Sequence, residues 1–374
     1  MKGSSPATPH IVVAGTDPAV PRGGIAAVMA EYVAAARSAG FSAELLPTYS
    51  RSRWSDKWRL AGKALWRLPW LVRAVRRRGA TVVAYVHVGG GWSLVREGMI
   101  LLCARLAGAR TAAQLHAVDV ETYLAHRLSR VLFRAAIAPA HLVCVLTPYW
   151  RERLTAAGIG KRLAVVPNPL PASSEAAARG ARPRAERGPG ILNVGIMTRL
   201  VPGKGVDTLI RAMAGLPEAR LVVAGAGPAR AACEGLASAL GLAGRVEFRG
   251  WLAGEAKERF FSDIDVFCLP TRYDSFGLPL VEAMARGLPV VALRWGAIPD
   301  VVEDGVTGIL VDGAESEALG GALRRLVDPA LRARLGVAAR GSVLERFAVE
   351  TVGRRLRAAF AAAGFLGGAA GTTA

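Results

Sequence analysis

Short apolar runs of strand length alternate with helix-length amphipathic stretches along nearly the whole chain. In the first half the predicted strands are His10–Ala14, Ala43–Leu46, Thr81–His87, Thr111–His116, Leu142–Leu146 and Leu163–Val166. In the second half they are Ile191–Gly195, Arg220–Ala224, Val246–Arg249, Val266–Leu269, Val290–Ala292 and Ile309–Val311. Strands that alternate with helices form parallel sheets covered by helices on both faces. The pattern therefore predicts an α/β fold with two doubly wound, Rossmann-like domains.

The alternation is interrupted over residues 171–189, where Ala, Arg, Gly and Pro recur without an apolar period. We expect an interdomain linker there, between a first domain of residues 1–170 and a second of residues 190–346. Residues 347–374 follow the second domain. Because doubly wound sheets bind ligands at the carboxyl ends of their strands, a site is expected in a cleft between the two domains.

Composition excludes several classes of protein. Among 374 residues, 52% are hydrophobic and 21% are charged, so the chain can bury a large core and is not disordered. Four cysteines lie in apolar stretches without Cys or His partners at zinc-site spacing, which indicates buried, reduced thiols and no metal: Cys103, Cys144, Cys233 and Cys268. With no signal-peptide pattern and no long uncharged apolar run, we expect a cytoplasmic protein that does not span a membrane.

The positive charge is concentrated in the first half. The net charge is +19 overall, and residues 1–170 contain 23 Lys and Arg against 8 Asp and Glu, a net +15. The remaining residues carry 25 against 21, a net +4. This asymmetry points to an anionic partner of the first domain.

The most specific motif is Tyr273–Gly287, with the sequence Tyr-Asp-Ser-Phe-Gly-Leu-Pro-Leu-Val-Glu-Ala-Met-Ala-Arg-Gly. It places Asp274 in a loop and Glu282 inside a helix. Gly277 permits a tight turn at the helix start, where the free N–H groups favour an anion. The two acids alone would also fit a solvated helix beside an ordinary loop.

This segment resembles the signature of family 4 glycosyltransferases, retaining enzymes of the GT-B fold. Other stretches that share the resemblance are Gly23–Ile25, Val165–Pro169, Gly195–Gly205, Val223–Pro228 and Arg245–Gly250. It implies two Rossmann-like domains, transfer of a hexose from a nucleotide-diphosphate sugar, and neither a metal nor a further cofactor. It also implies an acceptor-binding first domain, to which the helix at 347–360 crosses back.

The resemblance assigns roles in the second domain. Gly277, Leu278 and Glu282 are implied to bind the donor, and Asp274 to contact its sugar. The family usually has Glu at the position of Asp274, so the shorter side chain puts donor choice or rate in doubt. Arg199 and Lys204 are expected to stabilise the negative charge that develops on the leaving diphosphate.

In the first domain, the loop containing Gly23 and Gly24 precedes a helix and is implied to lie against the donor diphosphate. A flexible surface turn is the alternative. His116 ends a predicted strand, with Asp119 nearby, and is implied to contact the transferred sugar. His87 ends another strand and is expected to shape the acceptor side.

The basic, aromatic stretch Arg51–Arg78 contains ten Lys or Arg, one Asp and four of the eight tryptophans of the chain. Tryptophan favours membrane interfaces, and basic residues are attracted to anionic lipids. We favour docking on a membrane or acceptor through Trp54, Trp58, Trp66, Trp70, Arg76 and Arg77. A solvated helix with tryptophans in the core, or an RNA-binding patch, would give the same pattern.

The sequence as a whole predicts a cytoplasmic or peripheral-membrane hexosyltransferase. Its donor is expected to be a UDP or GDP sugar, and its acceptor a saccharide or lipid-linked molecule in surface polysaccharide or glycolipid assembly. A nucleotide-sugar epimerase of the same fold is one alternative. A basic nucleic-acid-binding protein is another, which leaves the segment Phe276–Glu282 unexplained.

Overall fold

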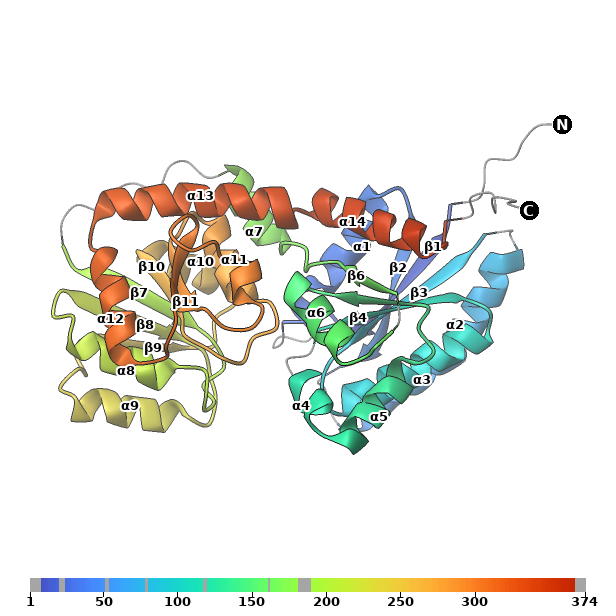
Figure 1. Cartoon of the computed structure of the whole chain (residues 1–374), viewed down its shortest axis with the longest axis horizontal. Helices are drawn as coiled ribbons and strands as arrows, with labels where there is room; N and C mark the ends of the chain where they lie inside the picture. The colour runs from blue at the N-terminus through green and yellow to red at the C-terminus, as the bar shows by residue number, and fades with distance from the viewer. Residues whose placement is uncertain are drawn as a thin grey trace. The chain divides into compact units, whose positions relative to one another are not determined.

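The computed structural model describes residues 8–19, 24–50, 54–77, 80–116, 120–160, 162–180 and 190–366, with the side chains of residues 54–59 outside that description. The chain divides into two compact units (Figure 1). Unit 1 consists of Met1–Pro171 with Phe347–Ala374, and unit 2 of Ala172–Arg346.

Unit 1 contains a six-stranded parallel sheet in the order β2-β1-β3-β4-β5-β6. Its strands are β1 (His10–Thr16), β2 (Ser42–Tyr49), β3 (Val82–Val88), β4 (Arg110–Leu115), β5 (Leu142–Val145) and β6 (Leu163–Val165). The strand order reverses between β1 and β3, which makes their carboxyl ends the expected ligand-binding edge.

Helices cover both faces of this sheet (Figure 1). One face carries α1 (Met29–Ser38), preceded by a short 3-10 turn η1 (Ala26–Val28), and α14 (Val349–Ala362). The other carries α2 (Trp54–Arg77), α3 (Trp92–Leu106) and α5 (Arg127–Ile137), which pack side by side. The remaining helices are α4 (Val120–Ala125) and α6 (Pro148–Ala156).

Unit 2 is a second six-stranded parallel sheet, in the order β12-β11-β10-β7-β8-β9. Its strands are β7 (Leu192–Met197), β8 (Ala219–Ala224), β9 (Val246–Gly250), β10 (Val266–Leu269), β11 (Val290–Leu293) and β12 (Gly308–Val311). This is the strand order of a Rossmann sheet, and it reverses between β7 and β10.

The helices of unit 2 also form two layers. On one face lie α8 (Val206–Ala214), α9 (Arg230–Ala239) and α12 (Ser316–Arg325), and on the other α7 (Ala172–Gly180), α10 (Gly254–Asp263) and α11 (Leu278–Ala285). A 3-10 turn η2 (Ile298–Asp300) and the long helix α13 (Pro329–Phe347) complete the unit. Two doubly wound domains are thus confirmed.

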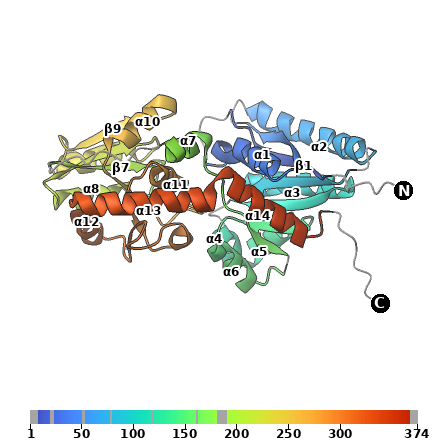
Figure 2. The same cartoon turned by 90° about the horizontal axis from the view of Figure 1, so that it is seen from above.

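The helix expected at 347–360 is α14, and it packs beside α1 (Figure 2). Gly353 makes this packing close, since a Cβ there would lie 2.4 Å from the backbone oxygen of Ala35. At the same interface, Arg357 donates a hydrogen bond to the backbone oxygen of Ala39 (2.9 Å). The last helix of the chain is therefore part of unit 1.

The linker predicted at residues 171–189 is corrected in part. Its first portion folds as α7, in which Ser174 and Glu175 are buried, and residues 181–189 lie outside the described part of the chain. Alanine-rich segments favour helix, and α7 is fixed by contacts with α11, including a 3.1 Å hydrogen bond from Arg286 to the Ser174 hydroxyl. Helix α7 is thus stabilised by tertiary contacts although its sequence has no apolar period.

Within the described residues, no helix is long and apolar enough to cross a membrane. The four cysteines are unpaired. Three are buried as expected, whereas Cys103 on α3 is only half-buried. Burial raises the pKa of the Cys144 thiol to about 12, so this side chain stays protonated.

Candidate functional site

In unit 2, Lys204 lies in the loop that follows β7, and Asp274 lies in the loop that follows β10. These two strands are neighbours at the reversal of strand order. Lys204 is 8% exposed, and its ammonium donates a hydrogen bond to the backbone oxygen of Tyr273 and lies 3.8 Å from Asp274 Oδ2. The structure therefore brings both predicted residues together at the edge of the sheet where a ligand is expected.

The electrostatics of Lys204 favour an additional anion. Burial lowers the pKa of its ammonium, the Asp274 carboxylate raises it in part, and the Arg199 guanidinium lowers it further. Because one carboxylate does not offset both burial and a neighbouring cation, an arriving diphosphate would stabilise the charged form of Lys204.

Two glycine contacts hold this loop in place. Gly205 adopts a φ of 75°, and a Cβ there would lie 2.1 Å from the backbone oxygen of Pro270. Next to it, a Cβ on Gly203 would lie 2.5 Å from the ring of Tyr273. The glycines on either side of Lys204 thus allow the loop after β7 to touch the loop after β10, which brings the lysine to Asp274.

The Gly-Ala-Gly-Pro segment after β8 acts as a support and packs against the loop that carries Arg199. Gly225 has a φ of 146°, and a Cβ there would lie 1.8 Å from the backbone oxygen of Thr198. Leu200 donates its N–H to the oxygen of Ala226 at 3.1 Å. Arg199 itself is exposed and has no ion-pair partner among the residues that the structure describes. The guanidinium of Arg199 is therefore held on a rigid loop, where a ligand can reach it.

Asp274 is tied to the backbone through its short side chain. Its Oδ1 accepts hydrogen bonds from the N–H groups of Phe276 (3.2 Å) and Gly277 (2.6 Å), while Oδ2 faces Lys204. These contacts fix the turn that starts α11, where Gly277 caps the helix with a φ of 75° and Leu278 is the first residue. In this chain the first acidic position of the motif therefore orders the loop and faces the lysine.

Glu282 lies on α11 and is 3% exposed. Its Oε1 pairs with the Lys257 ammonium on α10 at 2.5 Å. Lys257 is a residue that the sequence reasoning missed, because it belongs to no motif and sits 25 positions away. One carboxylate oxygen of Glu282 is thus held by a cation, and Oε2 is the atom that could accept a hydrogen bond from a sugar hydroxyl.

In unit 1, His116 and His87 form a buried pair at the carboxyl ends of β4 and β3. Their nitrogens Nε2 and Nδ1 lie 2.8 Å apart, and the rings stack with centroids separated by 5.1 Å. Burial lowers the pKa of His116 to about 3, and burial together with His116 lowers that of His87 well below its ordinary value. Both imidazoles are therefore neutral at physiological pH.

A polar network surrounds this pair. Tyr85 donates to Gln114 Oε1, and Gln114 donates to the backbone oxygen of Val166 (3.2 Å). Tyr32 donates to the oxygen of Pro167 and to Asn168 Oδ1, both at 3.2 Å. The Val165–Pro169 segment is thus bonded to α1 and β4 and serves as a scaffold for the histidines.

Lowering the pH is expected to destabilise unit 1 through these histidines. An unfolded imidazole titrates near 6.5, so between the folded and unfolded pKa values the unfolded state binds more protons and stability falls as the pH falls. At pH 5 the loss would be about 2 kcal/mol for His116. We expect His116→Asn to reduce the difference in melting temperature between pH 7.5 and pH 5. His126→Asn, at an exposed position, is the control, and equal pH dependence in all three proteins would contradict the expectation.

The remaining predicted residues of the first domain are Gly23, Gly24 and Asp119. Gly24 is exposed, and among the described residues no atom lies within 4 Å of a Cβ built there. Gly23 and Asp119 lie outside the described residues. The role of the glycine loop and the expected cleft between the domains stay predictions.

The basic, aromatic stretch forms α2, with the side chains of Trp54 and Trp58 outside the described set. Trp66 and Trp70 are 70% and 61% exposed, so neither fills the core of unit 1. Their rings lie 6.4 Å apart, and Arg76 and Arg77 at the end of the helix are also exposed.

Comparison with known proteins identifies the class. The sequence profile described as "Glycosyl transferases group 1" matches residues 182–342. The chain is also 34% identical, over 270 residues, to the GDP-mannose-dependent alpha-(1-6)-phosphatidylinositol monomannoside mannosyltransferase of Mycolicibacterium smegmatis (strain ATCC 700084 / mc(2)155), covering 68% of this chain and 70% of the relative. The chain therefore belongs to the glycosyl transferases group 1 family and is a glycosyltransferase.

Solved structures confirm the fold. Sucrose-phosphate synthase from Thermosynechococcus elongatus superposes with a TM-score of 0.70 at 23% identity, covering 95% of this chain and all of the other. HepE of Anabaena in complex with UDP-glucose gives a TM-score of 0.70 at 20% identity, covering 94% and 99%. The two parallel six-stranded sheets are those of the GT-B fold predicted from the sequence.

Proposed function

We propose that the chain is a retaining, metal-independent hexosyltransferase of family 4. Its donor would be a nucleotide-diphosphate sugar with uracil or guanine as the base. Its acceptor would be a saccharide or a membrane-associated lipid, in surface polysaccharide or glycolipid assembly. Neither the epimerase nor the nucleic-acid-binding alternative is favoured by an observation on the described residues.

The observation that carries this proposal is the buried Lys204 at the reversal of strand order in unit 2. A lysine that is 8% exposed, next to the exposed guanidinium of Arg199, is an electrostatic site for a compact, highly charged anion. The amino end of α11 at Gly277 and Leu278 adds the positive end of a helix dipole. A diphosphate is an anion of that size and charge.

The chemistry follows from where charge develops. As the bond between the anomeric carbon and the diphosphate breaks, the leaving oxygen becomes negative, and Arg199 and Lys204 would stabilise it in the transition state. In a retaining transfer by front-face attack, that phosphate oxygen takes the proton of the acceptor hydroxyl. Glu282 would accept hydrogen bonds from sugar hydroxyls of the donor, and neutral His116 would hydrogen-bond a hydroxyl of the transferred sugar.

The names of two matching proteins support the proposed donor and acceptor. The mannosyltransferase of M. smegmatis is named for GDP-mannose and a phosphatidylinositol monomannoside, and the HepE structure contains UDP-glucose. By analogy, we infer a UDP or GDP sugar as donor and favour a glycolipid acceptor.

Thermal unfolding with UDP, GDP and ADP, each with and without EDTA, tests the donor site. A nucleotide present at 100 times its dissociation constant should add about 2.7 kcal/mol to the free energy of unfolding, which raises the melting temperature measurably. We expect UDP or GDP to stabilise the protein equally in the presence of EDTA. Stabilisation that EDTA abolishes would contradict metal independence, and no stabilisation by any of the three would contradict the donor site.

A further inference from the structure

Unit 1 has one face that is unusually apolar for a layer of covering helices. Among the described residues of unit 1, every exposed large hydrophobic side chain lies on α2, α3 or α5. On α3 they recur at helical spacing as Trp92, Val95, Met99, Leu102 and Leu106, with exposures of 77%, 50%, 40%, 47% and 80%. Since α3 also buries Leu94, Ile100 and Leu101 against the sheet, this helix has an apolar stripe on its exposed side as well as on its buried side, which is not expected of a helix facing water.

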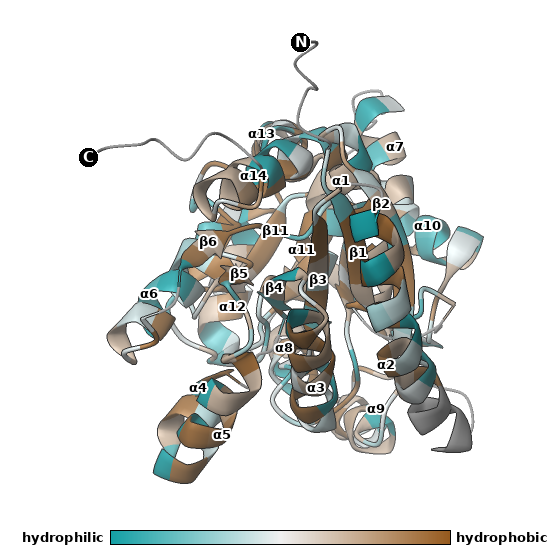
Figure 3. Cartoon of the chain, turned by 90° about the vertical axis from the view of Figure 1, so that its right-hand side faces the viewer, coloured by the Kyte–Doolittle hydropathy of each residue, from teal (hydrophilic) through white to brown (hydrophobic). Residues whose placement is uncertain are grey.

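The neighbouring helices extend this stripe into a continuous surface, which we call the α2–α3–α5 face. Leu128, Val131 and Leu132 of α5 are 72%, 61% and 59% exposed, and α2 contributes Trp66 and Trp70. The helices touch closely, because a Cβ on Gly98 of α3 would lie 3.0 Å from the backbone oxygen of Ala136. Figure 3 shows α3 and most of α5 in the brown of hydrophobic residues, with α2 beside α3.

Among the side chains that the structure describes, the exposed charges of this face are basic, while Asp56 on α2 lies outside the described side chains. Exposed basic side chains include Lys63, Arg67 and Arg73 on α2, Arg105 on α3, and Arg127 and Arg134 on α5. Helix α5 contains no acidic residue, and the one acid of α3, Glu97, is buried against Arg96. A second copy of the same face would bring like charges together, whereas an anionic surface would complement them.

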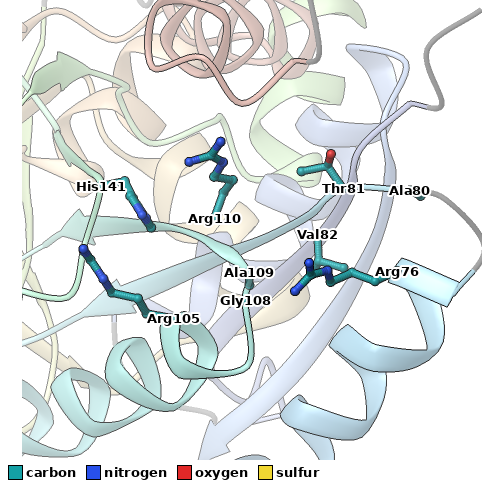
Figure 4. A pocket seen from close by; sticks show the side chains of 9 residues that line it. All are labelled: Arg76, Ala80, Thr81, Val82, Arg105, Gly108, Ala109, Arg110 and His141. Atoms are coloured by element: carbon teal, nitrogen blue, oxygen red, sulfur yellow. The ribbon is translucent and has the colours of Figure 1, made fainter.

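A cationic pocket lies where α2 and α3 end (Figure 4). It has a volume of about 540 Å³ and is lined by Arg76, Arg105 and Arg110, with His141 and no carboxylate among its lining residues. None of the three arginines makes an ion pair within the described ranges. Arg105 adjoins Leu106, the last side chain of the apolar stripe, so the pocket would receive anionic headgroups at the depth of a lipid interface.

We propose that the α2–α3–α5 face docks on an anionic lipid bilayer, with its apolar side chains inserted at the interface and Arg76, Arg105 and Arg110 around lipid phosphates. Tryptophan and leucine beside arginine are the side chains that such an interface accepts. The stripe begins at Trp92, four residues beyond the end of β3, so docking places the histidine edge of unit 1 next to the bilayer. This inference extends the acceptor part of the proposed function. Only the reason for docking, access to a lipid acceptor, rests on that function; the docking itself does not.

Vesicle flotation of the full chain tests the proposal without requiring transferase activity. The probes are vesicles of phosphatidylcholine alone and of phosphatidylcholine with phosphatidylglycerol. We expect binding to the anionic vesicles that weakens in high salt. Leu102→Gln with Leu106→Gln should lower the partition coefficient by about tenfold or more. Arg76→Glu with Arg105→Glu should lower it by at least about fivefold per residue.

The matched control is Leu240→Gln with Val337→Gln, two exposed positions of unit 2, which should bind vesicles like the wild type. Failure of the wild type to bind anionic vesicles, or equal losses in the control, would overturn the proposal. So would a dimer that Leu102→Gln with Leu106→Gln converts to a monomer while vesicle binding is absent, since the face would then belong to a second copy. Stabilisation by a nucleotide, measured on the same variants, reports on the donor site separately.

Discussion

Replacing Lys204 by methionine is expected to lower the transfer rate by about 10²- to 10³-fold, the effect typical of losing one preorganised charge at a developing anion. The expected size rests on the burial of Lys204, since a charge that water does not screen acts more strongly on a diphosphate. The measurement is the rate of nucleotide release from UDP and GDP sugars, together with the dissociation constant of the nucleotide that stabilises the protein. Arg211→Met removes an exposed cation from α8 and should leave both unchanged.

A double variant distinguishes two roles of Lys204, which are to stabilise charge on the substrate and to support the loop that contains Asp274. Lys204→Met leaves Asp274 without the cation that lies 3.8 Å away, so part of any loss could come from the loop before α11. Lys204→Met with Asp274→Asn removes both charges and keeps an oxygen to accept the N–H groups of Phe276 and Gly277. If the double variant recovers the melting temperature of the wild type but its rate stays low, loss of loop support does not explain the low rate, and the Lys204 cation acts on the substrate. Recovery of the rate in that variant would contradict a direct role for Lys204.

Lys257→Met is expected to reduce mainly the stability of the protein, and Glu282→Gln mainly its affinity for the nucleotide. Lys257→Met leaves a carboxylate that is 3% exposed without its cation, which should cost about 3 kcal/mol and lower the melting temperature of the domain by about 6–12 °C. Glu282→Gln keeps an oxygen for Lys257 and should cost less stability. It should weaken nucleotide binding by about tenfold or more, because hydrogen bonds to a charged group are lost.

The control on the same helix is Arg259→Met, whose ion pair with Glu255 is largely exposed and should contribute less than about 1 kcal/mol. The melting temperature and the nucleotide affinity of Lys257→Met, Glu282→Gln and Arg259→Met distinguish a structural role from a role in donor binding. If Glu282→Gln binds nucleotide as well as the wild type, Glu282 is a structural partner of Lys257 and does not bind the donor.

The two sheets could be predicted because each strand is a short apolar run between polar turns. All twelve predicted strands overlap observed ones, and Val266–Leu269 has the same bounds. Strands buried on both faces, such as β3, give the clearest signal. Helix α7 was not predicted this way, because its alanine-rich segment lacks an apolar period and its contacts with α11 are not visible in the local sequence.

The candidate site was likewise predictable from the sequence only in part. The resemblance implies that Lys204 and Asp274 both act on the donor, and the structure brings their side chains within 3.8 Å of each other. The sequence could not show that Asp274 turns back to the N–H groups of Phe276 and Gly277, nor that Lys257 reaches Glu282 from another helix. For the tryptophans of α2 the sequence favours the surface but leaves the core as an alternative, since a helical period does not say which face meets the sheet.

The position of α14 has a consequence for the order in which the molecule is made. Unit 2 is one continuous segment, whereas unit 1 is closed by a helix that follows all of unit 2 in the chain. On the ribosome, unit 2 can fold as soon as it emerges. The side of α1 that receives Gly353 and the ring of Phe41 that meets Phe360 stay uncovered until α14 has been synthesised. The domain that is translated first is thus the last to be completed, and its nascent form carries an apolar surface on which chaperones can act.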